Sequence, residues 1–500
     1  MIGEVLQGFV TVLSPGTFLY LLGGFGLGLF FGMVPGLTAT LAIALLLPIT
    51  FSLETTHAFV MAMAIFMAGM YSGSITGTLI NIPGAPGSAI TMMDSYPMMQ
   101  KGQGAKALSH AAFSSLIGGV TGVIILIFLC PLIAKAALLL QTADRFSLIF
   151  LALVAVAVSS RGSLTKGIIA TVFGLMLATI GIDVHLQTSR FCYGSPALAE
   201  GLGLIPVIIG VFAISELLIQ AERGRESYGG KAGIDLSKIK FHRRDFIPKL
   251  QDMKEIGVKL YVKSILIGLG VGALPGGGAA MAGYMSYAEA KRSSKHPEEF
   301  GRGSLEGICA SETANNAMCS GAVIPMLTLG IPGDAATAMV LGMFKIQGLL
   351  PGPAFLGQHF DLVTPMYAAL MISAILIPVA LLLFGCYYIR IAFIRRSLLY
   401  SFIAVIAMIG AYAAEFSVFQ MGVALALGAM TYLLRKHDYP AVPILMGVIL
   451  GPMAESYLRR ALIISGGSGW IFLTRPVSLI FLVVSVVFVY FFVFRRIKTA

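Results

Sequence analysis

The chain has 500 residues, of which 57% are hydrophobic and only 11% are charged, and its formal net charge is +11. This composition excludes an ordinary soluble domain. Repeated apolar runs of about 18 residues or more predict an all-α polytopic membrane protein rather than a β-barrel of short alternating strands. Because the basic residues lie in short loops between the apolar runs, the positive charge indicates orientation in a membrane. We therefore expect contact with lipid and not with nucleic acid.

The first half begins with an apolar segment, residues 18–48, that is interrupted at residues 32–38. Each arm is shorter than the roughly 20 residues of a spanning helix, so we expect either a re-entrant hairpin or a broken span at Pro35-Gly36. An apolar helix over residues 58–80 is broken at Asn81-Ile82-Pro83-Gly84, and a second helix begins near Ala85. Further spans are expected at residues 111–134, 146–158, 167–182 and 202–220.

The second half repeats this arrangement after the longest hydrophilic stretch of the chain. That stretch, residues 221–259, is rich in Lys and Arg and predicts a cytoplasmic linker between membrane repeats at residues 1–220 and 260–500. An apolar run over residues 261–288 is broken at residues 272–278, and a helix over residues 305–329 is interrupted at Gly330-Ile331-Pro332-Gly333. A helix from Asp334 to about Leu349 and four or five more spans follow, and the basic tail places the C-terminus in the cytoplasm.

The loops after the two Pro-Gly breaks differ in charge. The first contains Glu54 and no basic residue, whereas the second contains Lys291, Arg292, Lys295 and Arg302. Basic loops favour the cytoplasmic side, so these corresponding loops are expected on opposite sides of the membrane. The two halves are then inverted repeats with re-entrant hairpins and broken helices, as in secondary transporters.

The helix breaks predict a binding cavity. Proline lacks a backbone donor, and irregular backbone at membrane depth is tolerated only within protein or beside water. A helix that begins at a break presents free N–H groups, which bind carboxylates and phosphates. We therefore expect the substrate at residues that form or border the breaks, namely Pro35, Gly36, Thr38, Ser74, Asn81, Pro275, Gly276, Gly277 and Gly278.

Three polar residues of the second half are candidate cation ligands. Asn315, Asn316 and Thr328 precede the second interruption, and their oxygens suit Na⁺ at a broken helix. Hydrogen bonding between helices would equally explain the two asparagines. Asp334 directly follows Pro332-Gly333 and is expected to cap its helix. Glu312 either lies near the membrane interface or serves proton coupling.

Sequence motifs for catalysis are absent. The chain contains no phosphate-binding Gly-Lys-Ser/Thr pattern, no His-Glu-x-x-His and no Gly-x-Ser-x-Gly, and its five cysteines have no metal-ligand spacing. We expect neither enzymatic activity nor a cofactor.

Several segments resemble the large membrane subunit of tripartite tricarboxylate transporters. They are residues 32–38, 71–76, 294–301, 324–329 and 347–349, with Asn81-Ile82-Pro83-Gly84, Ala273-Leu274-Pro275-Gly276, Ala314-Asn315-Asn316-Ala317 and Gly330-Ile331-Pro332-Gly333. The resemblance covers essentially the whole chain. Ser311-Glu312-Thr313 replaces a commoner Pro-Glu-Ala, and Gly277-Gly278 replaces a commoner Leu-Gly, so the identity of the substrate stays open.

The resemblance implies a multi-pass transporter of the bacterial inner membrane that imports an organic carboxylate, coupled to Na⁺ or H⁺ and operating by an elevator-like movement. It also implies two partners, a small membrane subunit of about four spans and a periplasmic solute-binding protein, and it leaves a homodimer open. A passive anion channel is the alternative function, and it would conduct without an ion gradient or a binding protein.

Overall fold

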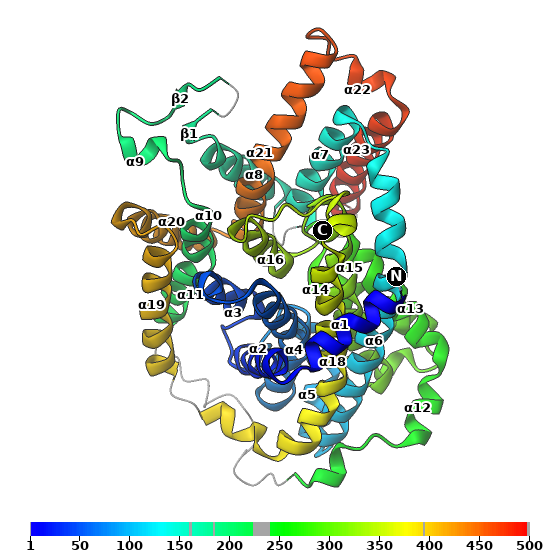
Figure 1. The fold of residues 1–500 in the computed structure, drawn as a ribbon. Coiled ribbons are helices and arrows are strands. Elements are labelled where there is room, and N and C mark those ends of the chain that lie inside the picture. Colours follow the sequence, from blue (N-terminus) through cyan, green and yellow to red (C-terminus); the bar gives the residue numbers. More distant parts are fainter. Residues whose placement is uncertain (1, 160–162, 184–185, 224–240, 394–395, 498–500) are drawn as a thin grey trace.

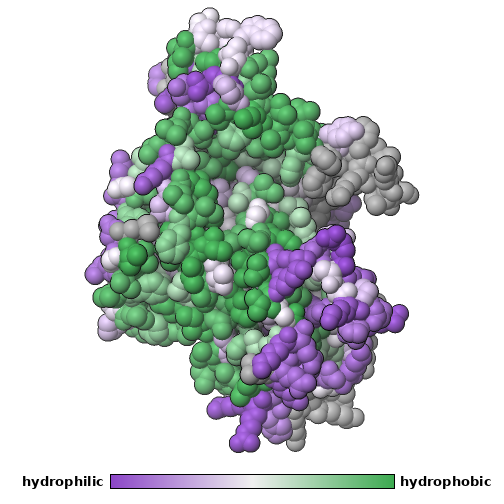
Figure 2. Space-filling view, turned by 90° about the vertical axis from the view of Figure 1, so that its right-hand side faces the viewer, coloured by the Kyte–Doolittle hydropathy of each residue, from purple (hydrophilic) through white to green (hydrophobic). Residues whose placement is uncertain are grey.

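The computed structural model describes residues 2–159, 163–183, 186–223, 241–393 and 396–497, and these are almost entirely helical (Figure 1). Eight helices in these ranges are long and apolar enough to cross a membrane. Hydrophobic residues cover most of the face in Figure 2, while hydrophilic residues gather at its lower right. The prediction of an all-α polytopic membrane protein is confirmed.

The described residues of the first half form eleven α-helices and one small sheet. Its elements are α1 (Ile2–Leu13), α2 (Pro15–Met33), α3 (Ala39–Leu46), the 3₁₀ helix η1 (Leu47–Ser52), α4 (Thr55–Ile80), α5 (Ser88–Gln100), α6 (Gly104–Leu138), α7 (Thr142–Ser159), α8 (Leu164–Ala178), β1 (Gly181–Ile182), β2 (Ser189–Arg190), α9 (Pro196–Ala199), α10 (Leu204–Ile208), the π-helix η2 (Ile209–Ile214) and α11 (Ser215–Arg223).

The second half continues in the same helical manner. Its elements are η5 (Arg243–Phe246), α12 (Leu250–Ile256), α13 (Val258–Ala273), α14 (Gly278–Ser293), η6 (Pro297–Glu299), α15 (Leu305–Leu329), α16 (Ala335–Ile346), α17 (Phe355–Gln358), α18 (Phe360–Phe384), η7 (Gly385–Phe393), α19 (Arg396–Ala413), α20 (Val418–Lys436), α21 (Ala441–Ile464), α22 (Ile471–Thr474) and α23 (Pro476–Ile497).

The two Pro-Gly breaks form tips of the same geometry. Val34 and Leu274 are extended, and Gly36 and Gly276 have φ of +88° and +76°. The Leu37 N–H donates to the Val34 carbonyl at 3.0 Å, and the Gly277 N–H donates to the Leu274 carbonyl at the same distance. Proline followed by a glycine of positive φ, closed by such a bond, is typical of a type II turn. Both Pro-Gly breaks are therefore tight turns, each joining two helices.

The two Ile-Pro-Gly interruptions also match each other. α4 ends at Asn81 and α15 ends at Gly330, each in the left-handed conformation with φ of 58° and 71°. The glycine of each interruption then packs on the helix that leads to the tip. A Cβ at Gly84 would lie 1.9 Å from the Gly32 carbonyl oxygen, and one at Gly333 would lie 2.2 Å from the Gly272 oxygen. Only glycine permits these close backbone approaches.

The helices that carry the interruptions occupy the interior. Nearly every residue of α4 is buried, as is α15 from Gly307 to Thr328. Small residues allow the partner helices to approach closely: Gly28 of α2 lies against the backbone of Ile65, and Gly268 of α13 lies against the backbone of Ala314. Such small-residue contacts are the usual means by which membrane helices pack.

The structure differs from the sequence predictions in one span and in part of the linker. The span expected at residues 167–182 is wrong at its end, because α8 stops at Ala178 and residues 181–182 pair with residues 189–190 in a two-stranded sheet. Of the predicted linker, residues 224–240 lie outside the described residues. The described remainder contains η5 and α12, and Phe246 is fully buried.

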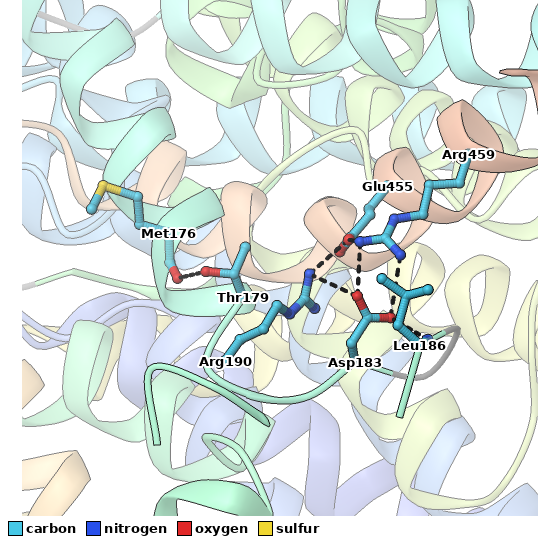
Figure 3. A network of polar contacts seen from close by, with 7 residues as sticks. All are labelled: Met176, Thr179, Asp183, Leu186, Arg190, Glu455 and Arg459. Carbon is cyan, nitrogen blue, oxygen red and sulfur yellow. Dashed lines mark hydrogen bonds and ion pairs between the residues drawn. The ribbon is translucent and has the colours of Figure 1, made fainter. Parts of the chain in front are cut away.

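The connector between α8 and α10 is fixed to α21 by charged groups (Figure 3). The Asp183 carboxylate, which is 2% exposed, lies 2.8 Å from Arg459 Nη2 and 3.5 Å from Arg190 Nη1. Glu455 Oε1 lies 2.7 Å from both arginines. Because Asp183 and Glu455 alternate with the two arginines, a connector predicted only as polar is held in one position on α21.

Candidate functional site

One cavity of about 420 Å³ is lined by residues that belong to, or directly follow, the four helix breaks. A volume of this order suits a small organic molecule. The breaks contribute residues 38–41, 85–86, 276–280 and 334–335, while α7, α11 and α20 contribute Val156, Glu216 and Arg435. Four irregular segments that are distant in sequence therefore surround a single space.

The predicted substrate residues divide into two groups. Thr38, Gly276, Gly277 and Gly278 line the cavity. The remaining five, Pro35, Gly36, Ser74, Asn81 and Pro275, are not among its lining residues. Three of these five belong to the turns that form the tips, while Asn81 is exposed and Ser74 hydrogen-bonds to Glu312. At each tip, most of the residues that line the cavity follow the turn and do not belong to it.

The four helices that begin at the cavity differ in how their N-termini are capped. Thr38 caps α3 by accepting from the Leu41 N–H at 3.2 Å, and Asp334 caps α16 by accepting from the Thr337 N–H at 2.9 Å. The expected cap at Asp334 is confirmed. The starts of α5 and α14, at Gly87 and Gly277, have no side-chain cap.

The two uncapped starts are neighbours, one from each half of the chain. A Cβ at Gly87 would lie 2.9 Å from the Cβ of Ala279. Both starts present backbone N–H groups and the positive ends of their helix dipoles, which attract anions. The starts of α5 and α14 therefore lack a side-chain acceptor and lie against each other beside the cavity, whereas α3 and α16 each have one capped N–H group.

Arg435, near the end of α20, supplies a full positive charge to the cavity wall. Its Nη2 lies 2.7 Å from Glu216 Oε2, and its Nη1 donates to Ser215 Oγ at 3.3 Å. Both Arg435 and Glu216 line the cavity. Sequence analysis did not identify this pair, because residues 216 and 435 are remote in sequence and each lies at a helix end where charge is ordinary.

The three candidate cation ligands do not lie together. Asn315 Nδ2 donates to the Met70 carbonyl at 2.9 Å, and Asn316 Nδ2 donates to the Met67 carbonyl at 3.4 Å. Thr328 Oγ1 donates to Ile324 within α15, and it lies about 18 Å along the helix from Asn316 at 1.5 Å per residue. The asparagines join α15 to α4, as expected for residues that hydrogen-bond between helices.

Glu312 is fully buried and is contacted from three helices. Ser74 on α4 and Thr91 on α5 donate to Oε1, the latter at 2.7 Å, and Ser115 on α6 donates to Oε2 at 3.0 Å. Among the described residues, no group of three or more His, Cys, Asp or Glu side chains is placed to hold a metal ion.

Comparison with known proteins now places the chain. Residues 18–446 match the family described as "Tripartite tricarboxylate transporter TctA family". The chain belongs to this family. No solved structure matches.

Two curated relatives come from Agrobacterium vitis. One, named "Uncharacterized 52.8 kDa protein in TAR-I ttuC' 3'region", is 34% identical over 480 residues, which are 96% of this chain and 93% of that protein. The other, "Uncharacterized protein in TAR-II ttuC' 3'region", is 36% identical over 208 residues, or 42% of this chain and 86% of that protein. The family resemblance drawn from the sequence is confirmed.

Proposed function

We propose that this protein is the permease subunit of an ion-coupled secondary transporter that imports an organic di- or tricarboxylate. The proposal rests chiefly on one observation, that residues belonging to or directly following the four helix breaks line one cavity, beside which two uncapped helix starts meet. Helix N-termini bind carboxylates through backbone N–H groups. A broken helix from each half is also the usual arrangement at the substrate site of secondary transporters.

Arg435 would bind a second carboxylate of the same substrate. Its side chain is held by Glu216 on the cavity wall, so an entering carboxylate would replace one anionic partner with another. Arginine and carboxylate can form two parallel hydrogen bonds, which favours a defined orientation. Two anion-binding places in one cavity suit a substrate with more than one carboxylate.

The matched breaks support transport by two inverted repeats, with an elevator-like movement of the helices that carry the tips. Residues 1–220 and 260–500 would be the repeats, and the C-terminus would lie in the cytoplasm. We place the protein in the bacterial inner membrane, where it would act with a small membrane subunit and a periplasmic solute-binding protein. These partners follow from its membership of a tripartite transporter family.

The test is uptake by the reconstituted complex. The protein would be incorporated into liposomes with its small membrane subunit, and carbon-14-labelled succinate, tartrate and citrate would be offered with and without the binding protein. We expect accumulation of at least one of these only when the binding protein and a Na⁺ or H⁺ gradient are both present. Flux that needs neither would instead show a passive anion channel and overturn the proposal.

A glycine pair provides the matched variants. Gly276→Val places a side chain at φ of +76° and against the Val156 Cα, 2.7 Å from the Cβ position. We expect it to abolish uptake while membrane insertion persists. Gly270→Val lies on the adjoining helix, where nothing is within 4 Å of an added Cβ, and it should leave uptake unchanged. Equal uptake by the two variants would contradict the assigned cavity.

A further inference from the structure

Three carboxylates are buried near the helix breaks, and they differ in the groups that contact them. Asp94 Oδ1 accepts from the backbone N–H groups of Gly301, Gly303 and Ser304 at 2.7–2.9 Å. Asp334 Oδ1 accepts from the backbone N–H of Thr337 at 2.9 Å and from its hydroxyl at 2.7 Å. An N–H group can only donate a hydrogen bond, so the surroundings of Asp94 in particular suit the ionised form of a carboxyl group.

Glu312 has surroundings of another kind. Ser74, Thr91 and Ser115 contact it through hydroxyl groups, and the Asn315 side chain also approaches it. A hydroxyl both donates and accepts, so it can donate to an ionised carboxylate and accept from a protonated carboxyl group. Thr91 also has a second hydrogen-bond acceptor, because its Oγ1 lies 2.9 Å from Ser311 Oγ. The Thr91 hydroxyl can donate to Ser311 when Glu312 is protonated. The three hydroxyl groups can therefore hydrogen-bond to either protonation state.

The other titratable groups on the elements packed around Glu312 leave its charge uncompensated. They include the phenols Tyr71 on α4, Tyr261 on α13 and Tyr287 on α14, the thiols Cys309 and Cys319 on α15, Asp94 on α5, His110 on α6, and Asp334 and Lys345 at the two ends of α16. Of the basic groups on these helices, Lys106 pairs with Asp252, and Lys263 and Arg292 pair with Glu289. Phenols are neutral near pH 7. His110 lies 3.7 Å from Asp252. Among the salt bridges of the described residues, none involves Glu312.

The Glu312 cluster lies directly beneath the floor of the cavity. Asn315 is one helical turn further along α15, and its Oδ1 would be 2.4 Å from a Cβ at Gly87. That oxygen is buried and has no hydrogen-bond partner among the described residues. Gly87 adjoins Ala279, which lines the cavity, so Asn315 lies between the Glu312 carboxyl group and the two uncapped helix starts.

We propose that Glu312 is the proton-binding residue of the transporter, and that its protonation favours binding of the substrate carboxylate in the cavity. This inference rests on the proposed function. When Glu312 is ionised, its buried negative charge repels an anion at the cavity floor, and a proton removes that repulsion. By linkage, the bound anion strengthens proton binding to the same degree, so the two are carried together.

The experiment compares Glu312→Gln, which imitates the protonated state, with Glu306→Gln, a matched substitution in the first turn of the same helix. In the reconstituted three-component system, labelled succinate, tartrate and citrate are offered under a proton gradient, and exchange is measured without a gradient. We expect Glu312→Gln to lose accumulation but to retain exchange, and its substrate binding to become independent of pH. Glu306→Gln should behave as the wild type.

The outcomes separate this inference from the function on which it rests. If the wild type accumulates none of the three acids under any ion gradient, the proposed function fails. If the wild type accumulates one under a proton gradient and Glu312→Gln does so equally, only the assignment of Glu312 fails. Accumulation that follows a Na⁺ gradient and is unaffected by pH also overturns the assignment.

Infrared spectroscopy of the purified protein provides a second measurement that needs no transport. The C=O stretch of a protonated carboxyl group should appear and disappear with pH in the wild type and in Glu306→Gln. It should be lost in Glu312→Gln, and its midpoint should shift in Thr91→Val, which leaves Glu312 in place. A band that persists in Glu312→Gln, or a wild type without a titrating band, would overturn the assignment.

Discussion

The two hairpin tips share a turn geometry but differ in what holds them. At the first tip, the Tyr400 hydroxyl donates to the Pro35 carbonyl at 3.0 Å, and a Cβ at Gly36 would meet the end of the Gln220 side chain at 2.2 Å. At the second tip, the Gly276 N–H donates to the Gly333 carbonyl at 2.9 Å, and a Cβ at Gly276 would meet the Val156 Cα at 2.7 Å.

This difference separates a tip held by side chains from one held by backbone. Gln220 and Tyr400 can rotate away from the first tip without moving a helix. The second tip is bonded to its own interruption, and it lies against the backbone of α7, so it moves only with those elements. We therefore expect the first tip to open more readily, although the two turns are nearly alike in sequence.

We expect the largest losses of stability at Gly84 and Gly333, which pack alike in the two halves. Gly84→Ala and Gly333→Ala each place a Cβ within about 2 Å of a backbone oxygen on the helix that leads to the tip. A backbone atom cannot rotate away, and overpacking of this kind costs about 1–3 kcal/mol or more. Both variants should lower the thermal unfolding midpoint in detergent, whereas Gly352→Ala, with open space around it, should not. A large loss in one half alone would show that the breaks are not equivalent.

The different contacts of the two tips predict unequal losses of uptake and stability when their glycines are replaced. Gly36→Ala and Gly276→Ala both force a side chain to positive φ, at a cost of about 1–2 kcal/mol. Only the second also drives a Cβ into backbone, at Val156. We expect Gly276→Ala to reduce uptake and stability more than Gly36→Ala does. Equal losses in both measurements would remove the distinction between the tips.

Local chemistry explains why the breaks could be predicted from sequence. Proline and glycine restrict backbone geometry over a few residues, so Pro35-Gly36 and Pro275-Gly276 specify their turns without help from the rest of the fold. The cap at Asp334 was predictable for the same reason, because its partner Thr337 is three residues away.

The groups that sequence analysis missed depend on contacts between remote segments. Glu216 and Arg435 meet only because α11 packs on α20, and Ser74, Thr91 and Ser115 reach Glu312 from three different helices. Thr328 was predicted to join Asn315 and Asn316 in one cation site because the three residues are close in sequence. Along α15, however, Thr328 lies about 18 Å from Asn316. A local sequence pattern does not predict which face of a buried helix packs against which other helix.

Loss of the helix cap at Asp334 is expected to lower stability by a smaller amount. Asp334→Ala removes the acceptor at the start of α16, and loss of such a cap costs about 1 kcal/mol. It would leave the helix starts of the second half uncapped at both α14 and α16. We expect a modest fall in the unfolding midpoint, with Asp334→Asn retaining most of the stability because its side chain can still accept. An unchanged midpoint in Asp334→Ala would show that the cap contributes little.

The smallest effect concerns the side chains that hold the first tip. Tyr400→Phe removes the hydrogen bond to the Pro35 carbonyl, and a bond of this kind contributes about 0.5–1.5 kcal/mol. The unfolding midpoint should change little, but amide hydrogen exchange at residues 34–38 should become faster because opening of the tip costs less. Residues 274–277 should exchange as in the wild type, as should the first tip in Tyr412→Phe, a control on the same helix whose side chain is 41% exposed. Faster exchange at both tips would mean that they open together, and the contrast between a tip held by side chains and one held by backbone would then have no consequence for movement.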